Sequence, residues 1–95
     1  MSKHGRVIIS RMMNLIDEYE RGKVKLHDLV DDLGSMYPSL DPAEQPPERE
    51  WLDAFIPLDR AADEGDGRDR QEIHRQIEEH LEHLKRLLTR SRRAA

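Results

Sequence analysis

The 95-residue sequence contains no cysteine, so it can form no disulfide framework, no thiolate metal site and no cysteine nucleophile. It also has no apolar run near the roughly 20 residues that cross a membrane. Ser10 and Arg11 interrupt the short run Val7-Ile8-Ile9, which therefore does not read as a signal peptide. We expect a soluble, cytoplasmic protein.

Large apolar and aromatic residues are scarce. The chain has one Trp, two Tyr and one Phe. Leu, Ile, Val and Phe together make up 21 of the 95 residues, just above the roughly 20% below which disorder is the better interpretation. The composition therefore predicts a single small domain over residues 1–95 with a modest core.

Apolar residues recur at steps of three and four, and no segment alternates with the period of a β-strand. Arg21 followed by Gly22 is typical of a helix C-terminus, and the short connection after it favours an antiparallel neighbour. The pattern predicts an all-α fold, a small antiparallel four-helix bundle. Its helices are expected over about 6–21, 26–37, 47–64 and 69–90, with a frayed tail over 91–95.

Prolines punctuate the middle of the chain. Four of the five fall between Pro38 and Pro47, where the segment Asp41-Pro42-Ala43-Glu44 predicts one short helical turn. Pro57 lies inside the third predicted helix and is expected to kink it or split it in two. Before that proline, the apolar residues expected to face the core are Trp51, Leu52, Phe55 and Ile56.

Charge is distributed unevenly beneath a formal net charge of −4. Residues 28–66 hold twelve acidic and two basic residues, whereas residues 67–95 hold five acidic and eight basic ones. The acidic section is either a solvated face that keeps a small protein in solution or an interface for a cationic protein. Trp51 is either a core residue or an apolar anchor of that interface.

Metal binding and catalysis have little support. His80 and His83, with Glu79 and Glu82, could form part of a metal site on one helix, but no second cluster exists to complete the coordination. The sequence has no glycine-rich phosphate loop, no nucleophile elbow and no Walker-type lysine. We therefore expect no metal, no cofactor and no enzymatic activity.

The order of these features resembles the small helical bacterial immunity proteins, such as those against colicin D and those of contact-dependent inhibition systems. The resemblance rests on an amphipathic first helix, the turn Gly22-Lys23-Val24-Lys25-Leu26, an aromatic third helix, Asp59-Arg60-Ala61 before an acidic turn, and a last helix of Ile and Leu. It implies a bundle that binds a cognate toxin nuclease, often a tRNase, with acidic side chains in place of RNA phosphates. By position these side chains are Asp59, Asp63, Glu64 and Asp66.

The leading hypothesis is thus an immunity protein that neutralises a cationic toxin nuclease by occluding its active site. The predicted partner-binding residues are Glu50, Trp51, Asp53, Asp59, Asp63, Glu64 and Asp66. One alternative is a structural or regulatory homodimer, in which the stripe of Leu81, Leu84 and Leu88 continues across a two-fold axis. Another is an RNA-binding regulator that uses Arg90, Arg92 and Arg93.

Overall fold

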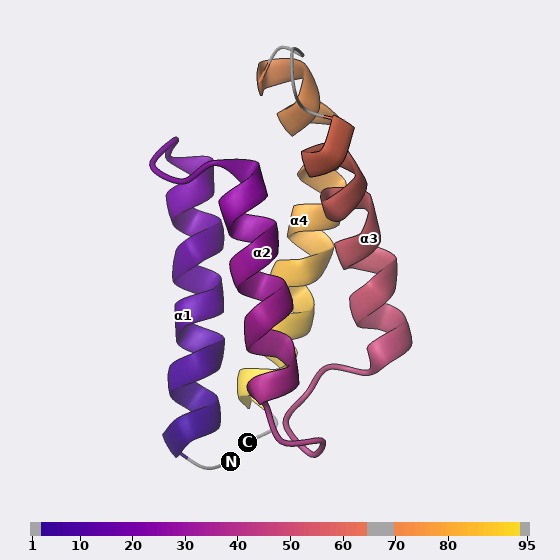
Figure 1. Ribbon diagram of the computed structural model, residues 1–95. Helices are drawn as coiled ribbons and strands as arrows, with labels where there is room; N and C mark the ends of the chain where they lie inside the picture. Colours follow the sequence, from indigo (N-terminus) through magenta and orange to yellow (C-terminus); the bar gives the residue numbers. More distant parts are fainter. Residues whose placement is uncertain (1–2, 65–69, 94–95) are drawn as a thin grey trace.

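The computed structural model describes residues 3–64 and 70–93, and this part of the chain folds into four α-helices with no strand (Figure 1). A single turn of 3-10 helix over Tyr37–Ser39 follows the second helix. The prediction of an all-α protein is confirmed. The helices are α1 (Lys3–Glu20), α2 (Leu26–Met36), α3 (Glu48–Glu64) and α4 (Arg70–Arg93).

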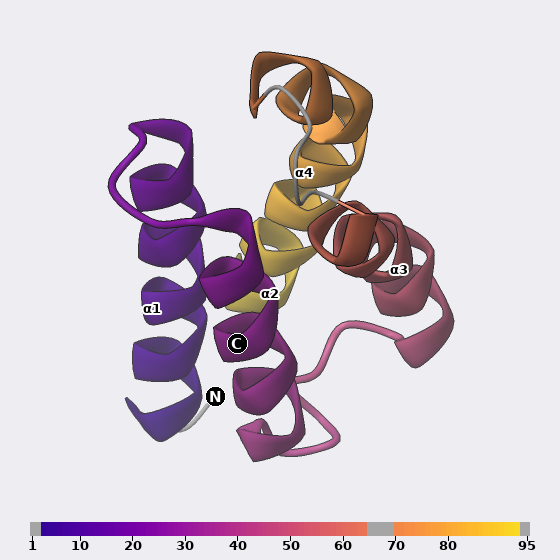
Figure 2. The ribbon, with the colours of Figure 1, turned by 45° about the horizontal axis from the view of Figure 1, so that its top comes forward.

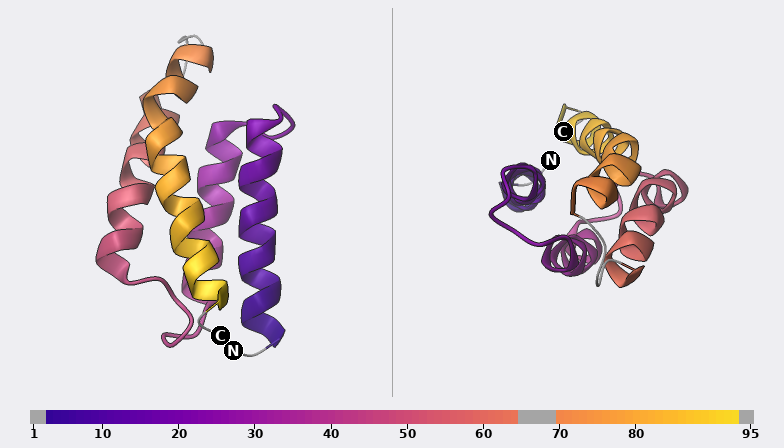
Figure 3. Two further views of the ribbon diagram at one scale, coloured as in Figure 1. Left: turned by 180° about the vertical axis from the view of Figure 1, so that it is seen from behind. Right: turned by 90° about the horizontal axis from the view of Figure 1, so that it is seen from above.

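The helices run alternately up and down, so the two ends of the chain lie at the same end of the bundle (Figure 1). Helix α1 packs against α2 and α4, and α3 packs against the same two helices. The view from above in Figure 3 shows α1 and α3 diagonally opposed. Figure 2 shows the α1–α2 and α3–α4 hairpins side by side, as expected for an antiparallel four-helix bundle.

Gly22 ends α1 as the sequence predicts. Its φ of 81° lies in the left-handed region that favours glycine. The Gly22 N–H donates to the carbonyl of Tyr19 at 3.0 Å, and the Lys23 N–H donates to that of Glu18 at 2.9 Å. This pair of bonds is the Schellman motif, which satisfies carbonyls that the helix end leaves without partners.

The predicted turn at Asp41 is also present. The N–H groups of Glu44 and Gln45 donate to the Asp41 carbonyl at 2.8 and 3.0 Å. The loop is tied back to the end of α2, because the Tyr37 hydroxyl donates to the carbonyl of Pro46 at 2.7 Å. These bonds hold the proline-rich segment against the end of α2, just before α3 begins.

The core contains residues from all four helices and from the loop before α3. Helix α3 contributes four residues at steps of three and four, and α4 contributes a longer apolar stripe. The buried hydrophobic residues are Ile8, Ile9, Met12, Ile16, Tyr19, Leu29, Val30, Leu33, Leu40, Trp51, Ala54, Leu58, Ala61, Ile73, Ile77, Leu81, Leu84, Leu87 and Leu88.

Pro57 was expected to kink the third helix or split it in two. Helix α3 is a single helix that contains Pro57, so the split does not occur. Helix α4 continues to Arg93, beyond the predicted end at Arg90, so residues 91–93 are helical rather than frayed. The predicted start of the fourth helix, at about residue 69, lies outside the described residues.

Candidate protein-binding surface on helix α3

The buried residues of α3 determine which side of the helix faces outward. Trp51, Ala54, Leu58 and Ala61 recur at the spacing of a single helical face, and all are buried. Positions 52 and 56 lie on the opposite face, because each residue advances about 100° around the helix. Leu52 and Ile56 therefore face outward because the four buried residues of α3 occupy the opposite face of the helix.

Leu52 is 38% exposed and Ile56 is 40% exposed, which overturns the expectation that both face the core. Apart from Val7 on α1, they are the only large apolar side chains exposed in the described part of the chain. The prediction failed because it grouped every apolar residue of this segment on one face. The spacing of positions 51, 54, 58 and 61 was the signal that could have separated them.

Trp51 belongs to the core and is only 3% exposed. Its ring stacks with that of Tyr37, with centroids 4.5 Å apart, and with that of Phe55, at 5.4 Å. The prediction of Trp51 as a partner-binding residue is corrected accordingly, since a side chain with 3% exposure offers almost no surface to a partner.

Asp59 and Asp63 are exposed beside the two apolar side chains. Within the described residues, neither carboxylate takes part in an ion pair. Position 63 follows Ile56 by seven residues, two helical turns, and so projects in almost the same direction. We call Leu52, Ile56, Asp59 and Asp63 the outer α3 surface.

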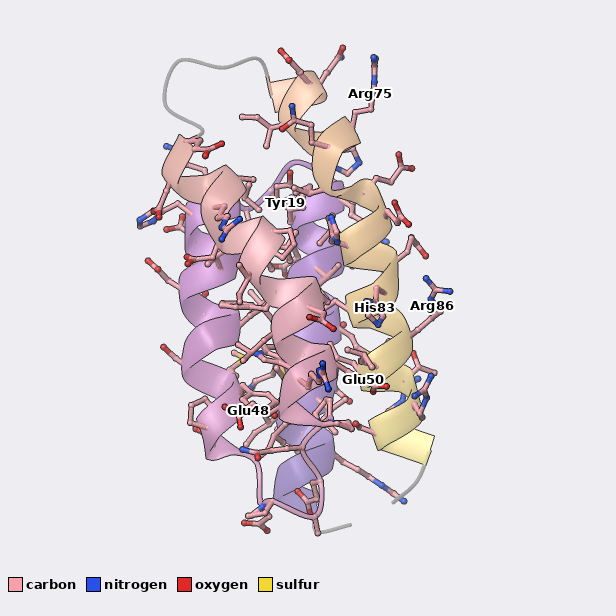
Figure 4. The ribbon with its side chains drawn as sticks, turned by 90° about the vertical axis from the view of Figure 1, so that its right-hand side faces the viewer. Tyr19, Glu48, Glu50, Arg75, His83 and Arg86 are labelled. Carbon is pink, nitrogen blue, oxygen red and sulfur yellow. The ribbon has the colours of Figure 1, made fainter. Side chains whose placement is uncertain are left out.

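The acidic character extends from this surface toward α2. Asp59 follows Glu48 by eleven residues, about three turns, and therefore projects on the same side of α3. Figure 4 shows that side to be the one nearer α2. Asp28 and Asp31 on α2 are exposed as well, and the Nδ1 atom of His27 lies 3.3 Å from the carboxylate of Asp31.

Glu50 and Asp53 project toward α4 instead, among cationic side chains. An oxygen of Glu50 lies 3.8 Å from the Arg90 guanidinium. Asp53 lines a hollow of about 440 Å³ whose other wall is formed by α4. Figure 4 shows Glu50 pointing toward the α4 side that carries His83 and Arg86. The α4 residues of this hollow are Glu79, His80, His83, Arg86 and Arg90.

The structure therefore divides the predicted acidic site. Asp59 and Asp63 share one open surface, while Glu50 and Asp53 lie across the helix beside α4. Glu64 is the exposed last residue of α3, and Asp66 lies outside the described residues. Only part of the acidic stretch therefore contributes to the outer α3 surface.

The histidines of α4 do not assemble a metal site in the part of the chain that the structure describes. Although His80 and His83 share a hollow with Asp53 and Glu79, no three His, Asp or Glu side chains of these residues converge as metal ligands. The hollow is chemically mixed, because it also contains Arg86 and Arg90.

Tyr37 connects the proline-rich loop to α3 and has an altered acidity. Burial of its ring, together with the negative charge of Glu48, raises the pKa of the phenol above its ordinary value of 10.0. The hydroxyl is therefore held in its protonated form, in which it donates to the Pro46 carbonyl.

On the far side of the bundle, Lys85 links α4 to α1 through ion pairs with Glu20 and with Glu82 of its own helix. Burial lowers the pKa of this ammonium, but the hydrogen bonds and charges of the two glutamates outweigh that effect and raise the pKa above 10.5.

A second hollow, of about 500 Å³, lies between the end of α1 and the start of α4. Because charges of both signs line it, including Arg75 and Glu78, it selects no class of ligand.

Comparisons with protein-family models, with curated proteins and with solved structures found no significant match to this chain. Among the described residues, none of the helices combines the length and the apolar character needed to cross a lipid bilayer.

Proposed function

We propose that this protein is an immunity- or antitoxin-type binding protein, without enzymatic activity, that neutralises a cationic toxin nuclease by covering its active site. One observation carries the proposal: the outer α3 surface places two exposed apolar side chains, Leu52 and Ile56, beside two exposed carboxylates, Asp59 and Asp63, that form no ion pair among the described residues. This combination suits recognition of a cationic protein surface.

The apolar and acidic groups would make different contributions. Burying a Leu or Ile side chain against a partner is worth about 1.5–3 kcal/mol when the burial is complete, so these residues would supply affinity. Residues 26–64 hold eleven acidic residues and two arginines, and this field would accelerate encounter with a cationic partner. An apolar centre with charged edges is the usual anatomy of a protein interface.

The class of partner comes from the resemblance to immunity proteins. A nuclease binds the phosphates of its substrate with cationic side chains, so a set of carboxylates can occupy the same positions. Asp59 and Asp63 fit this role best because they are exposed and are not neutralised by cations of the described chain. A tRNase is the form of nuclease that the resemblance favours.

The homodimer suggested by the Leu stripe of α4 loses its structural basis. Leu81, Leu84 and Leu88 are at most 1% exposed because they pack inside the bundle. A two-fold interface built on these residues would require the bundle to open, which makes a separate toxin partner the better proposal.

An immunity protein is expected to be encoded beside its toxin, so the proposal is tested with the product of the adjacent upstream gene, expressed with and without this protein. Wild-type protein should restore growth and bind the purified nuclease, whereas Asp59→Lys combined with Asp63→Lys should lose both properties. The matched control is Glu18→Lys with Glu78→Lys, which makes the same change in net charge on α1 and α4. Absence of wild-type binding, or equal binding by both double variants, would contradict the proposed function.

A further inference from the structure

The C-terminal half of α4 has a charge opposite to that of α3. Residues 80–93 contain one acidic residue, Glu82, against Lys85 and four arginines. Because α4 continues to Arg93, these cations belong to an ordered helix rather than to a frayed tail. These cations face Glu50 and Asp53, on the side of α3 that is turned toward α4.

Arg86 and Arg90 are at the centre of this surface. They line the hollow that faces α3, and they also line a second hollow of about 370 Å³ together with Lys85 and Thr89. Within the described residues Arg86 forms no ion pair, and the pair between Arg90 and Glu50 is long, at 3.8 Å. We call Arg86 and Arg90 the α4 cationic strip.

The strip suits discrete carboxylates better than a nucleic acid backbone. A polyanion must release counterions along several consecutive phosphates, which requires a row of available cations. Here Lys85 already pairs with two glutamates, and the carboxylates of Glu50, Asp53 and Glu79 border the strip. These acids would repel a continuous phosphate backbone but leave Arg86 accessible to a single side chain.

The α4 cationic strip lies close enough to α3 for one partner to contact both helices. Packed helices lie about 8–10 Å apart, and a standard interface covers about 800 Å² on each protein, which is wide enough for two adjacent helices. Figure 4 shows α3 and α4 side by side on one face, with Arg86 pointing outward from α4.

We propose that the α4 cationic strip is a second contact with the toxin nuclease and binds carboxylates that lie next to the cationic cleft. This inference rests on the proposed function. A partner with this arrangement is chemically reasonable, because a nuclease can use Asp or Glu as its general acid or base, close to the cations that bind phosphate. The two opposite charges would fix the orientation of the complex, since a rotated partner would meet charges of its own sign.

The experiment measures the dissociation constant of the nuclease from the adjacent gene for wild-type protein, Arg86→Glu and Arg86→Glu with Arg90→Glu. Arg11→Glu is the matched control, because it makes the same charge change at an exposed position of α1, the helix diagonally opposite α3. We expect Arg86→Glu to weaken binding about tenfold, the double variant to weaken it further, and Arg11→Glu to change it less than threefold. Thermal melting of each variant checks that the fold is kept.

The outcomes separate the two proposals. If Asp59→Lys with Asp63→Lys abolishes binding but Arg86→Glu stays within twofold of wild type, the strip is not a contact, although the proposed function stands. If the nuclease fails to bind wild-type protein, both proposals are wrong. A single-stranded RNA oligonucleotide serves as the competing probe: binding that Arg86→Glu with Arg90→Glu removes would assign the strip to nucleic acid and overturn the inference.

Discussion

Replacing each of two leucines of α3 with alanine tests the orientation of the helix on which the proposed surface depends. Leu58 is fully buried and Leu52 is 38% exposed, although the two are only six residues apart on one helix. Both changes are Leu→Ala, so the difference in helix propensity cancels between the variants. What remains is the burial of each side chain.

The expected free energies of unfolding follow from that burial. Leu58→Ala leaves a cavity between the helices and should cost about 3 kcal/mol. Leu52→Ala removes only a partly buried side chain and leaves no enclosed cavity, so we expect a cost of about 1 kcal/mol. For a domain of this size each kcal/mol lowers Tm by about 4–8 °C, which predicts a loss of about 12–24 °C for Leu58→Ala and about 4–8 °C for Leu52→Ala.

Thermal and urea unfolding should be followed by circular dichroism and by the fluorescence of Trp51, the only tryptophan, which is buried on the same helix. In the binding assay the order should reverse, with Leu52→Ala weakening the complex more than its small stability cost explains. Equal destabilisation by the two changes would mean that Leu52 also faces the core. The outer α3 surface would then keep only Ile56 as an apolar component.

Two further changes probe the scaffold. Gly34→Ala in the middle of α2 should stabilise the protein by about 1 kcal/mol in urea unfolding, because alanine favours the helix more than glycine does. The added Cβ would lie 3.4 Å from the Phe55 ring, close to an ordinary contact. A lower stability would show that this ring cannot adjust. Stability should also fall as pH rises above about 10, because the raised pKa values of Tyr37 and Lys85 make the folded chain bind more protons than the unfolded chain there. Tyr37→Phe should make that decline shallower, and an unchanged decline in a pH series of melts would contradict the assignment.

The sequence predicted the architecture well because helix number and direction depend on local signals. The steps of three and four between apolar residues identified four helices, and the order Arg21-Gly22 located the end of the first one within a residue. The turn at Asp41 was likewise readable from its proline and acidic neighbours. Each of these features needs only a few consecutive residues.

The orientation of α3 could not be read as easily, because it depends on which neighbours cover the helix. The eight apolar residues of α3 spread around more than one face. Only packing against α2 and α4 decides that Trp51 is buried and Leu52 is exposed. The absence of a split at Pro57 has a related cause. A proline costs a helix one hydrogen bond, but burial of Leu58 and Ala61 beyond it outweighs that loss and keeps α3 continuous.

The same dependence on packing explains why the carboxylates of the acidic stretch lie on two surfaces of α3 rather than on one. Carboxylates that are neighbours in sequence at positions 50 to 63 project to both sides of α3, and the side toward α4 meets Arg86 and Arg90. Charge reversal at Asp53 should therefore weaken binding of the partner less than charge reversal at Asp59, because Asp53 already shares its hollow with Arg86 and Arg90. Net charge along the sequence identifies an acidic protein, but only the rotation of each helix determines which of its charges a partner can reach.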